Sequence, residues 1–143
     1  MNQAIPMMHG RYCFFYGTLM SNFHNPLQEE VIPFLTYVGP ARINGYLYDI
    51  GGYPGLVPDA SGGQVYGEVY ELPAEHNELL VLLDDYEGIG KQHREPYEYQ
   101  RVMLPVQLDE DKVNGWVYAY NAPLNNCPLI PSGDYRTYRR QTC

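Results

Sequence analysis

Basic side chains are scarce in this sequence, which has 9 lysines and arginines, 17 acidic residues and a net charge of −8. The nearest approach to a basic run is Arg136, Arg139 and Arg140. Because an acidic chain repels phosphate backbones, we expect no nucleic acid partner. No apolar stretch approaches the ~20 residues of a membrane helix. Residues 1–10 also lack the apolar core and the leading positive charge of a signal peptide. We therefore expect no membrane association.

Cysteine is sparse as well. Cys13, Cys127 and Cys143 are odd in number and widely spaced, which matches neither a metal site nor a disulfide framework and fits a reducing, cytoplasmic setting. Cys13 lies inside an apolar run and is expected to be an inert core thiol. The sequence has no P-loop, no dinucleotide-binding motif and no Gly-x-Ser-x-Gly. The histidines show no ligand spacing: His9, His24, His76 and His93. We expect neither a metal nor a cofactor.

What the chain does contain is tyrosine, with 15 in 143 residues. This length is that of one domain, and 45% hydrophobic with 18% charged residues is a globular balance. Tyrosine favours strands and carries a hydroxyl at the end of an apolar ring. The tyrosines therefore indicate either a β-rich fold with a polar cavity or a tyrosine-rich core.

Apolar periodicity and turn residues divide the chain into strands and two short helices. The expected strands are residues 11–16, 37–49, 64–72, 97–106 and 114–120. The expected helices run from Asn25-Pro26 to about Leu35 and from Pro73 to about Tyr86. Residues 51–55 are expected to form a turn, and the chain after Asn121 an irregular wrap. This order, without regular βαβ alternation, predicts an α+β fold: a small mixed, barrel-like sheet with two or more flanking helices.

Two segments carry chemistry. Tyr16 to Met20 follows the first buried strand, and its Gly17 lets successive N–H groups form a small anion cradle. The alternative is a plain strand-to-loop turn. The second segment, Asp84 to Gly88, places three carboxylates at the end of a leucine-rich helix, where they oppose the helix dipole. Such local conflict often marks a functional site. The alternative is a solvated acidic cap.

Several segments match a known family pattern in order. They are Phe14–Leu19, Tyr53–Pro58, the block from Gly67 to Gly88, and Tyr99–Val102 with its Tyr-x-Arg pattern. Two weaker matches, 117–120 and 132–135, extend the likeness to residues 11–136. The ordered set resembles the γ-glutamylcyclotransferase-like (AIG2-like) family, on the branch of γ-glutamylamine cyclotransferases. We therefore divide the chain into a leader of residues 1–10, a domain of residues 11–136 and a tail of residues 137–143.

The resemblance implies which residues act. It places the catalytic carboxylate on Glu87, immediately before Gly88. It places the substrate-binding loop on Tyr16, Gly17, Thr18 and Leu19. Further candidates for binding are the tyrosines that would line the cavity or else pack in the core: Tyr53, Tyr99, Tyr118 and Tyr135. Two departures stand out, because residues 90–96 are unusually charged and Tyr135 replaces a tryptophan common among relatives.

The implied activity is an internal reaction of a small γ-glutamyl substrate. Its α-amine attacks its own γ-carbonyl, releasing 5-oxoproline and a free amine, with Glu87 moving the proton. Two alternatives stay open: a non-catalytic ligand-binding or regulatory protein on the same fold, and an enzyme that removes a γ-glutamyl group from a specialised metabolite or polyamine. The sequence predicts neither the leaving amine nor the oligomeric state.

Overall fold

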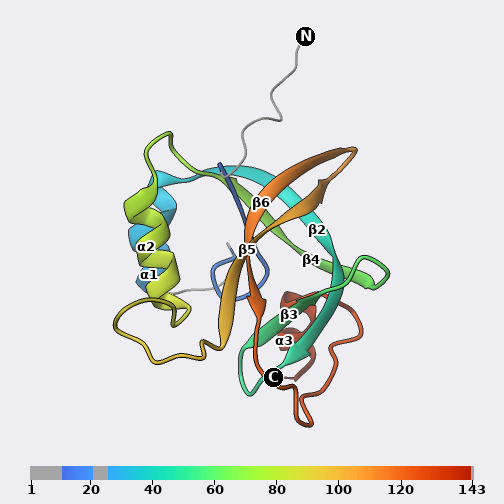
Figure 1. The fold of residues 1–143 in the computed structure, drawn as a ribbon. Helices are drawn as coiled ribbons and strands as arrows, with labels where there is room; N and C mark the ends of the chain where they lie inside the picture. Colours follow the sequence, from blue (N-terminus) through green and yellow to red (C-terminus); the bar gives the residue numbers. More distant parts are fainter. Residues whose placement is uncertain (1–10, 21–25, 143) are drawn as a thin grey trace.

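The computed structural model describes residues 11–20 and 26–142, and its six strands form one sheet (Figure 1). The strand order is β1-β4-β2-β3-β6-β5, and further pairings of β1 with β6 and of β2 with β5 bring the sheet round on itself. The strands are β1 Tyr12–Phe15, β2 Thr36–Asp49, β3 Pro54–Pro58, β4 Gly63–Glu71, β5 Tyr99–Leu108 and β6 Asp111–Tyr120. The prediction of an α+β fold with a mixed, barrel-like sheet is confirmed.

The helices flank this barrel. They are α1 Pro26–Val31, the short 3-10 helix η2 Ile32–Phe34, α2 Asn77–Tyr86 and α3 Tyr135–Thr142. The first predicted helix changes type at Ile32 and ends at Phe34, because Pro33 has no N–H to continue an α-helix. The second begins at Asn77 rather than Pro73. The proposed cap at Asn25 and the proposed leader, residues 1–10, lie outside the described residues.

The predicted turn at residues 51–55 was wrong in its second half. Only the Gly51-Gly52 segment turns, with φ of 136° and 104°, and Asp49 Oδ1 accepts hydrogen bonds from both N–H groups. Pro54 then begins β3, which pairs with the end of β2. β3 also pairs with the distant strand β6, through Leu56 and Ala119, and these pairings form a strand although its own composition favours a turn.

The prediction of an irregular wrap after Asn121 is confirmed for residues 121–134, which lie outside the named helices and strands, but was wrong for residues 135–142, where helix α3 occupies most of the proposed tail. Asp134 caps the helix: its carboxylate accepts hydrogen bonds from the Arg136 N–H at 3.1 Å and from Thr137 Oγ1 at 3.2 Å. Tyr138 also donates a hydrogen bond to Asp49 Oδ2 at 2.5 Å. These contacts attach the helix to the barrel.

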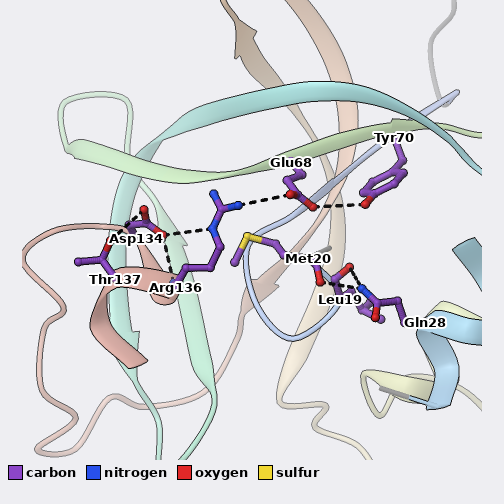
Figure 2. Close-up of polar contacts among 8 residues, drawn as sticks. All are labelled: Leu19, Met20, Gln28, Glu68, Tyr70, Asp134, Arg136 and Thr137. Atoms are coloured by element: carbon purple, nitrogen blue, oxygen red, sulfur yellow. Dashed lines mark hydrogen bonds and ion pairs between the residues drawn. The ribbon is translucent and has the colours of Figure 1, made fainter. Parts of the chain in front are cut away.

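A buried ion pair joins α3 to β4 (Figure 2). Arg136 Nη1 lies 3.3 Å from Glu68 Oε2, and the Glu68 side chain is only 3% exposed. Tyr70 donates a second hydrogen bond to Glu68 at 3.3 Å.

The neighbouring Gly67 is needed because a Cβ there would lie 2.3 Å from the carbonyl oxygen of Phe15. The close approach of β1 to β4 thereby fixes where β1 ends and the following loop begins.

Candidate active site

Helix α2 ends in a Schellman motif that determines the position of Glu87. Glu87 is the C-cap, and Gly88 follows in the left-handed conformation with φ of 81°. The Gly88 N–H donates to Asp85 O at 3.0 Å, and the Ile89 N–H donates to Asp84 O at 2.8 Å. The Glu-Gly order therefore has a structural cause, since glycine terminates the helix immediately after the carboxylate residue.

Glu87 lines a cavity of about 480 Å³, here called the Glu87 cavity. It lies between the end of α2, the loop after β1 and the starts of β3 and β5. Of the predicted site residues, all except Tyr135 are among its lining residues. The lining comprises Phe14, Phe15, Tyr16, Gly17, Thr18, Leu19, Tyr53, Pro54, Tyr86, Glu87, Gly88, Glu98, Tyr99 and Tyr118.

The environment of Glu87 suits a proton acceptor. Burial raises its pKa from 4.5 to about 7, and the nearby carboxylates of Glu98 and Asp84 add to the shift. Within the described part of the chain, no hydrogen bond or ion pair holds the Glu87 carboxylate. A carboxylate with a pKa near neutrality takes up and releases protons at the pH at which most enzymes work.

The other two acidic residues of the same helix end are already engaged. Asp84 accepts hydrogen bonds from Arg101 Nε at 2.7 Å and from the Tyr118 hydroxyl at 2.6 Å. Asp85 Oδ1 lies 2.8 Å from His93 Nε2. The three neighbouring carboxylates therefore differ in their surroundings, and Glu87 alone faces the cavity without such a partner in residues 11–20 and 26–142.

The loop after β1 is held from both sides. Tyr16 donates a hydrogen bond to Tyr118 O at 2.5 Å and accepts one from the Leu56 N–H at 3.2 Å. Gln28 of α1 donates to Leu19 O at 3.2 Å and to Met20 O at 2.6 Å (Figure 2). These bonds fix the loop without using its outward amides.

Two loop amides remain available for a ligand. Neither the Gly17 N–H nor the Leu19 N–H donates to another described residue, and Met20 closes the turn by donating to Gly17 O at 3.0 Å. The Thr18 hydroxyl lies 2.9 Å from the Tyr86 hydroxyl. The loop that lines the cavity together with Glu87 therefore contains two backbone donors with no acceptor among the described residues.

The buried tyrosines of the cavity donate their hydroxyl protons to acceptors within the protein. Tyr99 donates to Pro54 O at 2.5 Å and Tyr118 to Asp84, so both hydroxyls support the cavity wall through protein partners. Burial raises the pKa of Tyr16, Tyr99 and Tyr118, which keeps these phenols protonated as donors. The phenols thus hold the wall in place.

Tyr135 corrects a prediction. It is fully buried in α3, donates to Gly52 O at 3.1 Å, and is absent from the lining of the Glu87 cavity. Arg139 donates to its hydroxyl at 2.8 Å. Because α3 forms where an irregular wrap was expected, Tyr135 binds the 51–53 turn and does not line the cavity.

Sequence reasoning missed Glu98, the second carboxylate of the Glu87 cavity. Tyr53 donates a hydrogen bond to Glu98 Oε2, and this bond, more than burial, raises the pKa of Tyr53 to about 12. The sequence analysis placed Glu98 inside the expected strand of residues 97–106 and assigned it no role, whereas β5 begins at Tyr99. The cavity-facing position becomes visible only once β5 is paired.

No group of side chains in residues 11–20 and 26–142 has the arrangement of a metal site. In the same residues, no helix is long and apolar enough to cross a membrane. Burial raises the pKa of the Cys13 thiol to about 12, which agrees with the prediction of an inert core cysteine.

Comparisons with known proteins agree on one family. The family model described as gamma-glutamyl cyclotransferase, AIG2-like, matches residues 13–137. The gamma-glutamylcyclotransferase family protein YtfP of Escherichia coli is 32% identical over 123 residues, which are 85% of this chain and 93% of YtfP.

Solved structures show the same fold. The solution structure of ytfP from Escherichia coli has a TM-score of 0.63 at 30% identity, covering 90% of this chain and 98% of that one. The crystal structure of a mouse AIG2-like protein has a TM-score of 0.64 at 27% identity, with coverage of 85% and 86%. In both, the similarity spans nearly the whole of the other chain.

Proposed function

The chain belongs to the AIG2-like γ-glutamyl cyclotransferase family, and from this premise we propose that it converts a small γ-glutamyl amine or γ-glutamyl peptide into 5-oxoproline and a free amine. One observation carries the proposal. The Glu87 carboxylate, with a pKa near 7, lines the same cavity as the amides of Gly17 and Leu19. A proton acceptor and anion donors are the two things that this reaction requires of a protein.

The first step is activation of the nucleophile. A free α-amine has a pKa of about 8, so at neutral pH the amine is mostly an ammonium ion without a lone pair. Glu87 accepts one proton from this ammonium, and the small difference in pKa makes the transfer nearly balanced in energy. The amine nitrogen then attacks the γ-carbonyl carbon of the same molecule.

The second step is collapse of the tetrahedral intermediate. The new bond joins the α-nitrogen to the γ-carbon, and the bond from the γ-carbon to the leaving nitrogen breaks. Glu87 returns its proton to the leaving nitrogen. The ring nitrogen, which carries two hydrogens after the attack, gives up its extra proton through Glu87 to the released amine. The amine then departs as an ammonium ion, the ring nitrogen keeps one hydrogen, and Glu87 ends ionised. The amides of Gly17 and Leu19 are suited to hold the α-carboxylate or the developing oxyanion.

The remaining task is to fold the substrate. Closing a five-membered ring already gives a high effective molarity, so the enzyme gains most by holding the γ-glutamyl chain in its curled conformer. The hydrogen bonds of Tyr16, Tyr99 and Gln28 keep the cavity wall rigid for this purpose.

Cys13 and Cys127 are free thiols, which fits the proposed cytoplasmic setting.

A direct assay tests the proposal. The purified protein is incubated with γ-glutamyl amines, γ-glutamyl-ε-lysine and glutathione, and 5-oxoproline is quantified by mass spectrometry. We expect release from at least one substrate, and none from the same substrate with the Glu87→Gln variant. Tight binding of these compounds without any 5-oxoproline would instead support a ligand-binding or regulatory protein.

A further inference from the structure

The Glu87 cavity has an excess of negative charge, although the proposed substrate has a zwitterionic γ-glutamyl group. Its described lining residues include two carboxylates, Glu87 and Glu98, but no lysine, arginine or histidine. The α-ammonium of a γ-glutamyl group can be matched by one carboxylate, and the loop amides suit its α-carboxylate. The second carboxylate therefore has no counterpart in the part of the substrate that all γ-glutamyl compounds share.

Glu98 lies on the solvent side of this cavity. Its only described side-chain partner is the hydroxyl of Tyr53, and Tyr53 is 38% exposed. The backbone of Glu98 is fixed, because the Asn121 N–H donates to its carbonyl oxygen at 2.7 Å. Phe14, Phe15 and Leu19, in contrast, are at most 5% exposed and form the buried side of the lining.

This division suggests which part of a substrate meets each carboxylate. The glutamyl head must reach the loop amides and Glu87, where the ring closes. The leaving amine then extends past Tyr53 and Glu98 toward solvent. A carboxylate held in place at this point attracts a positive charge on the leaving portion and repels a negative one.

Resting on the proposed function, we propose that Glu98 is a specificity-determining residue that selects γ-glutamyl conjugates whose leaving amine carries a second positive charge. The disfavoured class is the γ-glutamyl peptides, whose leaving group ends in a carboxylate. Tyr53 is the positioning residue for Glu98, since its hydroxyl holds the carboxylate at the cavity wall.

Three substrates of matched length isolate the charge. They are the γ-glutamyl monoamides of 1,4-diaminobutane, pentylamine and 4-aminobutanoic acid, with positive, neutral and negative tails. We expect kcat/KM to fall in that order, with roughly three- to tenfold between neighbours at low salt. The differences should shrink as ionic strength rises, because salt screens a partly exposed pair.

The Glu98→Gln variant tests the residue itself. Because Glu98 also raises the pKa of Glu87, its removal changes the rate with every substrate. The ratio of kcat/KM between the positive and negative substrates cancels this shared effect. We expect the ratio to fall about tenfold or more in Glu98→Gln and to stay unchanged in Glu95→Gln, a matched control that removes a charge from the same segment outside the cavity lining.

Equilibrium binding separates failure of this inference from failure of the proposed function. The same three compounds are titrated by calorimetry into Glu87→Gln and into the Glu87→Gln/Glu98→Gln double variant. Affinity for the positive compound that depends on Glu98 supports the inference, even if the wild type releases no 5-oxoproline and the proposed function fails. Equal affinities for the positive and negative compounds, or a preference that survives loss of Glu98, overturn it. A uniform loss with all three compounds also overturns it, because Glu98 then binds the shared glutamyl head.

Discussion

Glu68 and Glu87 are the same side chain in two contrasting surroundings. Glu68 lies inside the fold, where Arg136 and Tyr70 bind its carboxylate (Figure 2). Glu87 lines a cavity, with other carboxylates nearby and no described partner. The two regions are close neighbours, since Phe15 pairs with Glu68 across β1 and β4, and the loop of the Glu87 cavity begins one residue later.

The difference lies in what stabilises the negative charge. A buried carboxylate with a cationic partner serves as a fixed structural contact. A carboxylate that loses water without gaining such a partner is destabilised when ionised, and it therefore holds a proton near neutral pH. The first arrangement stabilises the attachment of α3, and the second makes Glu87 reactive.

The largest expected effect is on catalysis by Glu87. Glu87→Gln keeps nearly the same shape, but an amide cannot accept a proton at neutral pH. We expect kcat/KM for 5-oxoproline release to fall by ~10²–10⁴-fold, which is about 2.7–5.5 kcal/mol of barrier. Asp85→Asn is the matched control, because Asp85 contacts His93 outside the cavity. A folded Glu87→Gln protein that keeps more than about a tenth of the wild-type rate would remove Glu87 from the mechanism.

At the Glu68–Arg136 ion pair, the expected effect is on the free energy of unfolding. Arg136→Leu removes the Arg136 cation from the buried Glu68 carboxylate, and breaking such a pair from one side costs about 3 kcal/mol or more. Urea unfolding followed by circular dichroism measures the loss. Arg140→Leu, which changes an exposed residue of the same helix, should cost less than about 0.5 kcal/mol. Equal midpoints for the two variants would mean that the ion pair does not hold α3.

The Glu87 cavity and the Glu68–Arg136 pair differ in how much of each can be predicted from the sequence. Gly17 after a buried strand and Gly88 after a leucine-rich helix are local signals, and the two segments that they mark both line the cavity. The Glu68–Arg136 pair joins residues that are 68 positions apart, and no local sequence pattern indicates it. A similar reason applies to β3, which also pairs with the distant strand β6, and to Glu98, which meets Glu87 only in the folded cavity.

The comparison also predicts how stability depends on pH. The pKa of Glu87 is about 7 in the folded protein and near 4.5 when exposed, so the unfolded state releases this proton first. Ionisation therefore favours unfolding between these pH values, and the contribution of Glu87 to stability decreases as pH rises. Glu87→Gln should match the wild type near pH 4 and exceed it by about 3 kcal/mol at pH 8. Urea unfolding at both pH values measures this, and a variant that is less stable at pH 8 would contradict the environment assigned to Glu87.

The smallest expected effect concerns Gln28, which supports the loop of the Glu87 cavity from outside. Gln28→Met preserves the length of the side chain but removes both hydrogen bonds to Leu19 O and Met20 O (Figure 2). Hydrogen bonds of this kind typically contribute about 1 kcal/mol each, and water replaces part of the loss at a half-buried site. Since the loop amides are proposed to bind the substrate, a less ordered loop should raise KM by about three- to fivefold and leave kcat within about twofold. Steady-state kinetics at several substrate concentrations separates the two constants. A large fall in kcat with unchanged KM would instead place Gln28 in the proton-transfer machinery, which Glu87 is expected to provide alone.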